Sequence, residues 1–182
     1  MSDTSRKIAD ELTTAYKTEV KGYFYYSAAA DLMENERGRK VFSHLATDEL
    51  DHIKVVYALA ESLKAGRGWL DYAEAVKAGV DGPTKAAEIF PGENELVKML
   101  EENQTDLNAV SIGIEIEENA VDFYSGLLKG ADTPEEKVVL TELLEMEKGH
   151  LKILRWEAEA LKRTGFWGDT MEFSVEKEKD GE

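Results

Sequence analysis

The stretch LLEMEKGHLKIL, residues 143–154, places two ionisable groups inside the apolar stripe of a predicted helix. Its leucines recur at helical spacing, so one face of the helix is predicted to enter a core. Glu147 and His150 lie on that face three residues apart, and their side chains project to the same side about one turn apart. A carboxylate and an imidazole on a core face need a partner there.

The same pattern occurs 98 residues earlier in the chain. A single Glu-x-x-His in so acidic a sequence indicates only a charged surface helix, but its recurrence within a second apolar stripe indicates a site. Shifting the chain by 98 residues without gaps aligns several identical pairs, among them Glu19 with Glu117, Tyr26 with Tyr124, Glu49 with Glu147, and His52 with His150. The repeat predicts two similar helical hairpins.

Four long helical patterns carry this repeat, at residues 4–33, 37–64, 105–130 and 133–163. The last begins with a capping box formed by Thr133 and Glu136, and Gly165 marks its end. Residues 65–104 contain glycine and proline breaks and are predicted to hold two or three short helices. A crossover of this length lets the second and third long helices run parallel in an all-α four-helix bundle. We expect the bundle to span residues 1–165, followed by an acidic tail at 166–182.

The spacing within each hairpin predicts where the glutamates lie. Glu19 and Glu49 are 30 residues apart with a predicted turn midway, as are Glu117 and Glu147. Fifteen residues of helix rise about 22 Å, so the chain returns to its starting height and each pair lies level. Four buried carboxylates would be very costly unless cations neutralise them, and a mixed carboxylate and imidazole set suits iron or manganese. One glutamate from each of two helices plus Glu-x-x-His from the other two is the pattern of ferritin-like dimetal proteins. The predicted metal ligands are Glu19, Glu49, His52, Glu117, Glu147 and His150.

Other residues near the predicted ligands have two interpretations. Tyr26 and Tyr124 follow the ligands of their helices by seven residues, and they either hydrogen-bond the ligand carboxylates or pack as core aromatics. Gly22 and Ala120 leave room for an exogenous ligand or allow close packing. His44 is predicted to lie at the surface or an interface.

Composition narrows the class of protein. The 182 residues contain no cysteine, which excludes disulfides, four-cysteine metal sites and thiol catalysis and is compatible with the cytoplasm. No signal segment or membrane-spanning run is apparent, so we expect no membrane association. The formal net charge of −16 argues against a nucleic-acid partner.

Residues 16–63 and 107–161 resemble the rubrerythrin group of the ferritin-like superfamily. The resemblance rests on KGYFYYSAAA after Glu19, ATDELDH ending at His52, EENAVDFY from Glu117 and LEMEKGH ending at His150. It implies a non-haem di-iron centre with an oxo or hydroxo bridge, two irons per chain, and a homodimer or larger assembly. It also implies that Glu49 and Glu147 bridge or chelate the irons, with Glu19 and Glu117 terminal.

The chain departs from that group in two ways. Rubrerythrins in the strict sense carry a four-cysteine rubredoxin domain, and this sequence has no cysteine, so we expect an external electron-donor protein such as a rubredoxin. Rubrerythrins also carry an extra glutamate where this chain has Ala120, so we expect a symmetric site with six protein ligands.

The predicted function is reduction of hydrogen peroxide in oxidative-stress defence, with H2O2 or O2 as the oxidant. A ferroxidase that handles iron is the first alternative, and the acidic composition suits it. A di-iron oxygenase acting on an organic substrate is the second. The third is a scaffold whose metal site serves stability or signalling.

Overall fold

The computed structural model describes residues 3–89 and 94–168, which form an all-α fold without strands in those ranges. This confirms the predicted fold class. The helices of the described residues are α1 (Asp3–Leu32), α2 (Glu36–Lys64), α3 (Tyr72–Ala78), α4 (Gly82–Ile89), α5 (Glu95–Glu102), α6 (Asp106–Lys129) and α7 (Pro134–Thr164).

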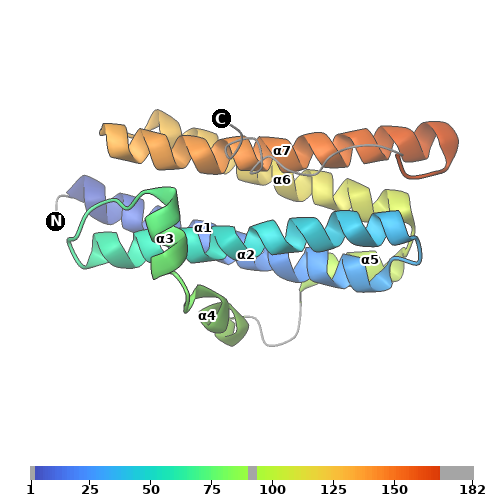
Figure 1. Ribbon diagram of the computed structural model, residues 1–182, viewed down its shortest axis with the longest axis horizontal. Helices are drawn as coiled ribbons and strands as arrows, with labels where there is room; N and C mark the ends of the chain where they lie inside the picture. The colour runs from blue at the N-terminus through green and yellow to red at the C-terminus, as the bar shows by residue number, and fades with distance from the viewer. Residues whose placement is uncertain (1–2, 90–93, 169–182) are drawn as a thin grey trace.

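The four long helices form the bundle, as two antiparallel hairpins (Figure 1). α1 packs along α2, and α6 packs along α7. The colour gradient in Figure 1 shows that α2 and α6 run in the same direction, as the long crossover between them allows.

Local sequence sets the helix ends. The Asn35 side chain accepts hydrogen bonds from the first turn of α2. Thr133 and Glu136 form the predicted capping box of α7. α7 ends at Gly165, whose left-handed φ of 75° suits a residue without a Cβ. These caps fix the hairpin turns and so the relative height of the helices.

The crossover holds three short helices on the outside of the bundle. α3 packs on α2, α4 contacts α1 and α2, and α5 contacts α1 and α6. Gly79, at the end of α3, lies so close to α2 that a Cβ there would be 1.9 Å from the carbonyl oxygen of Lys54. The crossover is thus held tightly against α2.

The core consists of two apolar clusters. One includes Leu12, Val56 and Leu143, and the other includes Phe42 and Leu154. On α2, α6 and α7 the predicted ligands fall between the residues of these two clusters, and on α1 Glu19 lies next to Val20 at the inner end of the first cluster. Apolar packing above and below therefore encloses them at mid-height.

The residues that follow α7 pack back against the bundle. Trp167 is buried, stacks edge-on against Phe42, and donates from its indole N–H to Asp106. Residues 169–182, most of the predicted tail, lie outside the described residues. None of the helices described is both long and apolar enough to cross a membrane.

Candidate metal centre

All six predicted ligands face one another in the centre of the bundle. α1 contributes Glu19, α6 contributes Glu117, and each of α2 and α7 contributes one Glu-x-x-His pair. Every one of the six is at most 3% exposed. Donor atoms of four of them lie within 4.8 Å of one another: Glu49, His52, Glu147 and His150.

The donor atoms divide into two half-sites. In the His52 half-site, Nδ1 of His52 lies 3.0 Å from Oε1 of Glu147, 3.5 Å from Oε2 of Glu49 and 3.7 Å from Oε2 of Glu19. Glu19 is thus the carboxylate that belongs to this half-site alone.

The His150 half-site repeats this arrangement. Nδ1 of His150 lies 3.4 Å from Oε2 of Glu147, 3.7 Å from Oε1 of Glu117 and 4.0 Å from Oε1 of Glu49. Glu49 and Glu147 therefore turn one oxygen toward each half-site, as bridging carboxylates do. The two imidazole rings lie 5.4 Å apart between centroids.

The buried polar atoms of this cluster fit a pair of metal ions. Buried polar side chains are nearly always hydrogen-bonded. Here seven buried atoms have no hydrogen-bond partner among the described residues: Oε2 of Glu49, both ring nitrogens of His52, Oε2 of Glu117, both oxygens of Glu147, and Nδ1 of His150. Divalent cations would satisfy all of these atoms except Nε2 of His52, which faces away from the ligand carboxylates, and would neutralise the carboxylates. The set of oxygen and imidazole ligands matches iron or manganese chemistry.

Electrostatics in the metal-free cluster show how strongly the groups interact. Burial raises the pKa of Glu49 well above its usual range and that of Glu117 to about 7. Burial alone would raise the pKa of Glu147, but the two imidazoles outweigh it and hold that pKa below its usual range. Burial alone would lower the pKa values of His52 and His150, but the surrounding carboxylates outweigh it and raise both. Without metal, protons on the imidazoles take the place of cations.

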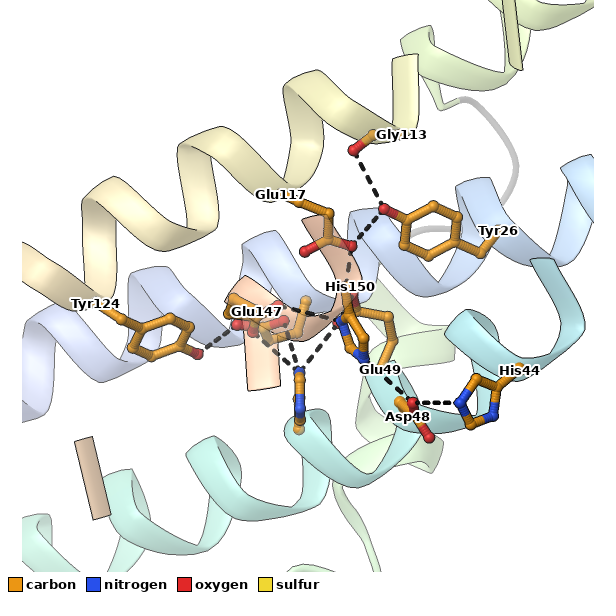
Figure 2. Close-up of polar contacts among 11 residues, drawn as sticks. Tyr26, His44, Asp48, Glu49, Gly113, Glu117, Tyr124, Glu147 and His150 are labelled. Carbon is orange, nitrogen blue, oxygen red and sulfur yellow. Dashed lines mark hydrogen bonds and ion pairs between the residues drawn. The ribbon is translucent and has the colours of Figure 1, made fainter. Parts of the chain in front are cut away.

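Two buried tyrosines donate hydrogen bonds to Glu19 and Glu117, the two carboxylates that each belong to a single half-site. Tyr26 of α1 donates to Oε1 of Glu117 at 2.5 Å, and Tyr124 of α6 donates to Oε1 of Glu19. Each bond crosses from one hairpin to the other, as Figure 2 shows for Tyr26 and Glu117. Burial raises the pKa of both phenols well above their usual value, so each stays a hydrogen-bond donor.

Gly22 lies next to a ligand carboxylate. A Cβ on Gly22 would be 3.4 Å from the carboxyl carbon of Glu49, which is an ordinary van der Waals contact, so an alanine would also fit there. Ala120 is buried. Both interpretations of these small residues stay predictions.

Sequence reasoning missed Asp48. Oδ2 of Asp48 lies 3.1 Å from Nε2 of His150 and 3.3 Å from Nε2 of His44 (Figure 2). His44 is partly exposed and is not among the clustered ligands, in line with its predicted place. The available signal was weak: Asp48 follows His44 by four residues, on one helical face, and aligns with an apolar residue, Met146, in the repeat.

The fold and the site define a ferritin-like bundle with a candidate dimetal carboxylate centre. A family model described as Rubrerythrin matches residues 10–158, and the chain belongs to this family. Searches of curated proteins and of solved structures gave no significant match. Family and buried glutamate–histidine cluster together fit a di-iron protein.

Proposed function

We propose that this protein is a non-haem di-iron oxidoreductase that reduces hydrogen peroxide, with electrons from an external protein donor such as a rubredoxin. The observation that carries the proposal is the buried, two-fold repeated set of six ligands with two shared glutamates. These 182 residues contain no cysteine and so cannot form a rubredoxin-type iron site themselves. The resemblance implies a homodimer or larger assembly, and we expect the protein to serve oxidative-stress defence in the cytoplasm.

The six residues would divide as ligands between two irons. Glu19 and His52 would hold one, Glu117 and His150 the other, and the two shared glutamates would bind both. Reduction of one H2O2 to two waters breaks the O–O bond and takes up two electrons and two protons. A bound pair of ferrous ions would supply the two electrons.

The tyrosines prepare the site for proton transfer. Tyr26 and Tyr124 keep their phenolic protons because burial disfavours the phenolates. Each O–H fixes one unshared carboxylate in the direction of its half-site. The carboxylate–tyrosine pairs are therefore the groups placed to hold and pass on protons next to a bound oxidant.

Access to the centre favours a small oxidant over an organic substrate. The six ligands are at most 3% exposed. A cavity of about 700 Å³ is lined by Arg37, Trp156, Phe166 and neighbouring residues at one end of the bundle, away from the ligands. H2O2 and O2 need no preformed pocket of that size, whereas an oxygenase substrate needs one beside the metals.

Iron oxidation and handling is the second candidate function, favoured by the net charge of −16, which concentrates cations near the protein. One experiment separates the two. Protein purified without oxygen and loaded with Fe²⁺ is mixed with H2O2 or O2, and absorbance and iron content are followed. Much faster oxidation by H2O2, with uptake ending at two irons per chain, supports the peroxidase. Faster oxidation by O2 with continued uptake supports the ferroxidase. No iron binding would overturn both.

A further inference from the structure

The two-fold repeat of the centre is broken in the layer around the histidines. Ligands and tyrosines match in pairs across the 98-residue shift, but Asp48 of α2 corresponds to Met146 of α7, and His44 corresponds to Glu142. The two half-sites therefore have the same ligands and different surroundings.

Asp48 holds the imidazole of one half-site. Its Oδ2 lies 3.1 Å from Nε2 of His150, across the seam between α2 and α7. The same oxygen lies 3.3 Å from Nε2 of His44. The side chains become more buried inward, with 30% of His44, 16% of Asp48 and 3% of His150 exposed. With Nε2 of His150 bonded to a carboxylate, Nδ1 is the nitrogen that faces the ligand carboxylates.

The other imidazole lacks such a partner. Nε2 of His52 is fully buried and has no hydrogen-bond partner among the described residues. A thioether, as in Met146, is at best a weak acceptor for an imidazole N–H. The tautomer and ring orientation of His52 are thus set by packing and by the ligand carboxylates alone.

We propose that Asp48 is a positioning residue that makes the two metal positions unequal, so that the His150 half-site binds metal first and more tightly than the His52 half-site. A carboxylate on the distal nitrogen fixes the metal-binding tautomer, orients the ring and makes it a stronger ligand. Because the His150 ring is already held in place, less side-chain entropy is lost when a metal binds the His150 half-site. The His52 half-site has no such advantage. The inference rests on the proposed dimetal centre but not on its oxidant or reaction.

The expected size of the effect follows from the behaviour of such partners elsewhere. Loss of an outer carboxylate partner of a metal-binding histidine typically weakens metal affinity about 10- to 100-fold. We expect the two binding steps of the wild-type protein to differ by a factor of that order.

The test is an anaerobic titration of the metal-free full chain with Co²⁺, followed by calorimetry and visible absorption. Asp48→Met makes α2 match α7, and it should weaken the first step until the two steps merge. Asp48→Asn retains an oxygen acceptor and should restore part of the difference. Met146→Asp places a carboxylate at the corresponding position of α7, and it should tighten the second step. Asp51→Asn is the matched control. This substitution also removes one carboxylate charge from α2, but Asp51 pairs with Lys54 rather than with a histidine of the centre.

Proton NMR of the protein with one Co²⁺ bound supplies a readout that a purely structural role would not change. The wild-type should show a single hyperfine-shifted imidazole N–H signal, from His150, and Asp48→Met should shift or remove it. Two equal steps in the wild-type, or a difference that survives Asp48→Met with unchanged circular dichroism, would overturn the inference. If Asp48→Met fails to fold, the Met146→Asp titration decides, and an unchanged second step there counts against the inference. Absence of any Co²⁺ binding by the wild-type would instead overturn the dimetal centre itself.

Discussion

At the scale of single residues, the centre consists of paired groups that follow the repeat and of one carboxylate, Asp48, that does not. The meeting of six candidate ligands at one height of the bundle could be predicted, because the three in each hairpin recur 98 residues apart on apolar faces. The sequence left two interpretations for Tyr26 and Tyr124, and the structure shows that both hydrogen-bond candidate ligands. The place of Asp48 could not be predicted, since it sits among other acidic residues in TDELD and has no polar counterpart in the repeat. Only the packing of α2 against α7 brings it to His150.

Adjacent tyrosines allow the role of the Tyr26 phenol to be separated from its contribution to folding. Tyr25 is also buried, but it donates to the backbone oxygen of Ala109 rather than to a ligand. We expect Tyr26→Phe and Tyr25→Phe to lose similar stability, about 1 kcal/mol each, for one hydrogen bond. Only Tyr26→Phe should slow oxidation of the ferrous protein by H2O2, by about 10-fold. Equal rates in the two variants would show that the bond to Glu117 has no part in the chemistry.

The two shared carboxylates should respond oppositely when each is neutralised in the metal-free protein. The folded-state pKa of Glu49 is raised, so above the unfolded carboxyl pKa of 4.5 this group destabilises the fold, and Glu49→Gln should stabilise it. The pKa of Glu147 is lowered by His52 and His150, so its charge stabilises the fold at neutral pH and is lost in acid. Glu147→Gln should therefore destabilise it.

Each change is expected to be about 1–3 kcal/mol in the free energy of unfolding at neutral pH, measured in urea. Both variants should bind metal less tightly than the wild-type. The loss of folding stability that the Glu49 carboxylate causes would then be the cost of a metal ligand. Changes of the same sign in the two variants would contradict the electrostatic account of the cluster.

At the scale of helices, the long elements were predictable and the contacts of the crossover were not. The helices predicted at 4–33 and 133–163 are observed as α1 and α7, whose ends differ from the prediction by one residue, because apolar periodicity and the Thr133 and Gly165 caps mark them. The crossover was predicted only to contain two or three short helices. Its packing depends on the close approach of Gly79 to Lys54, which no local pattern encodes.

Two glycines should respond oppositely to alanine. A Cβ at Gly79 would overlap the backbone of α2, so Gly79→Ala should destabilise the protein by about 1–3 kcal/mol. Gly126 lies within α6, and a Cβ there would meet nothing within 4 Å. Gly126→Ala should stabilise the protein by about 0.5–1 kcal/mol, because alanine loses less entropy in a helix. Urea midpoints measure both, and a neutral Gly79→Ala would contradict the close crossover contact.

At the scale of the whole molecule, metal binding is coupled to proton release. In the metal-free protein the raised pKa values of Glu117, about 7, and of both histidines keep protons in the cluster at neutral pH. A metal must displace them, so its apparent affinity should rise as pH rises through about 7. Calorimetry in two buffers of different ionisation enthalpy counts the protons released. Affinity that falls with rising pH, or binding without proton release, would contradict this assignment.

The bundle as a whole buries four carboxylates and two imidazoles in its core, which costs free energy unless cations neutralise the carboxylates. We expect two metal ions to do so. The most direct measurement is the iron content per chain after anaerobic dialysis of the full protein against Fe²⁺, with Glu49→Gln and Glu147→Gln dialysed in parallel. The account predicts two irons per wild-type chain and fewer in both variants. One iron or none in the wild-type, or two in both variants, would contradict the dimetal centre.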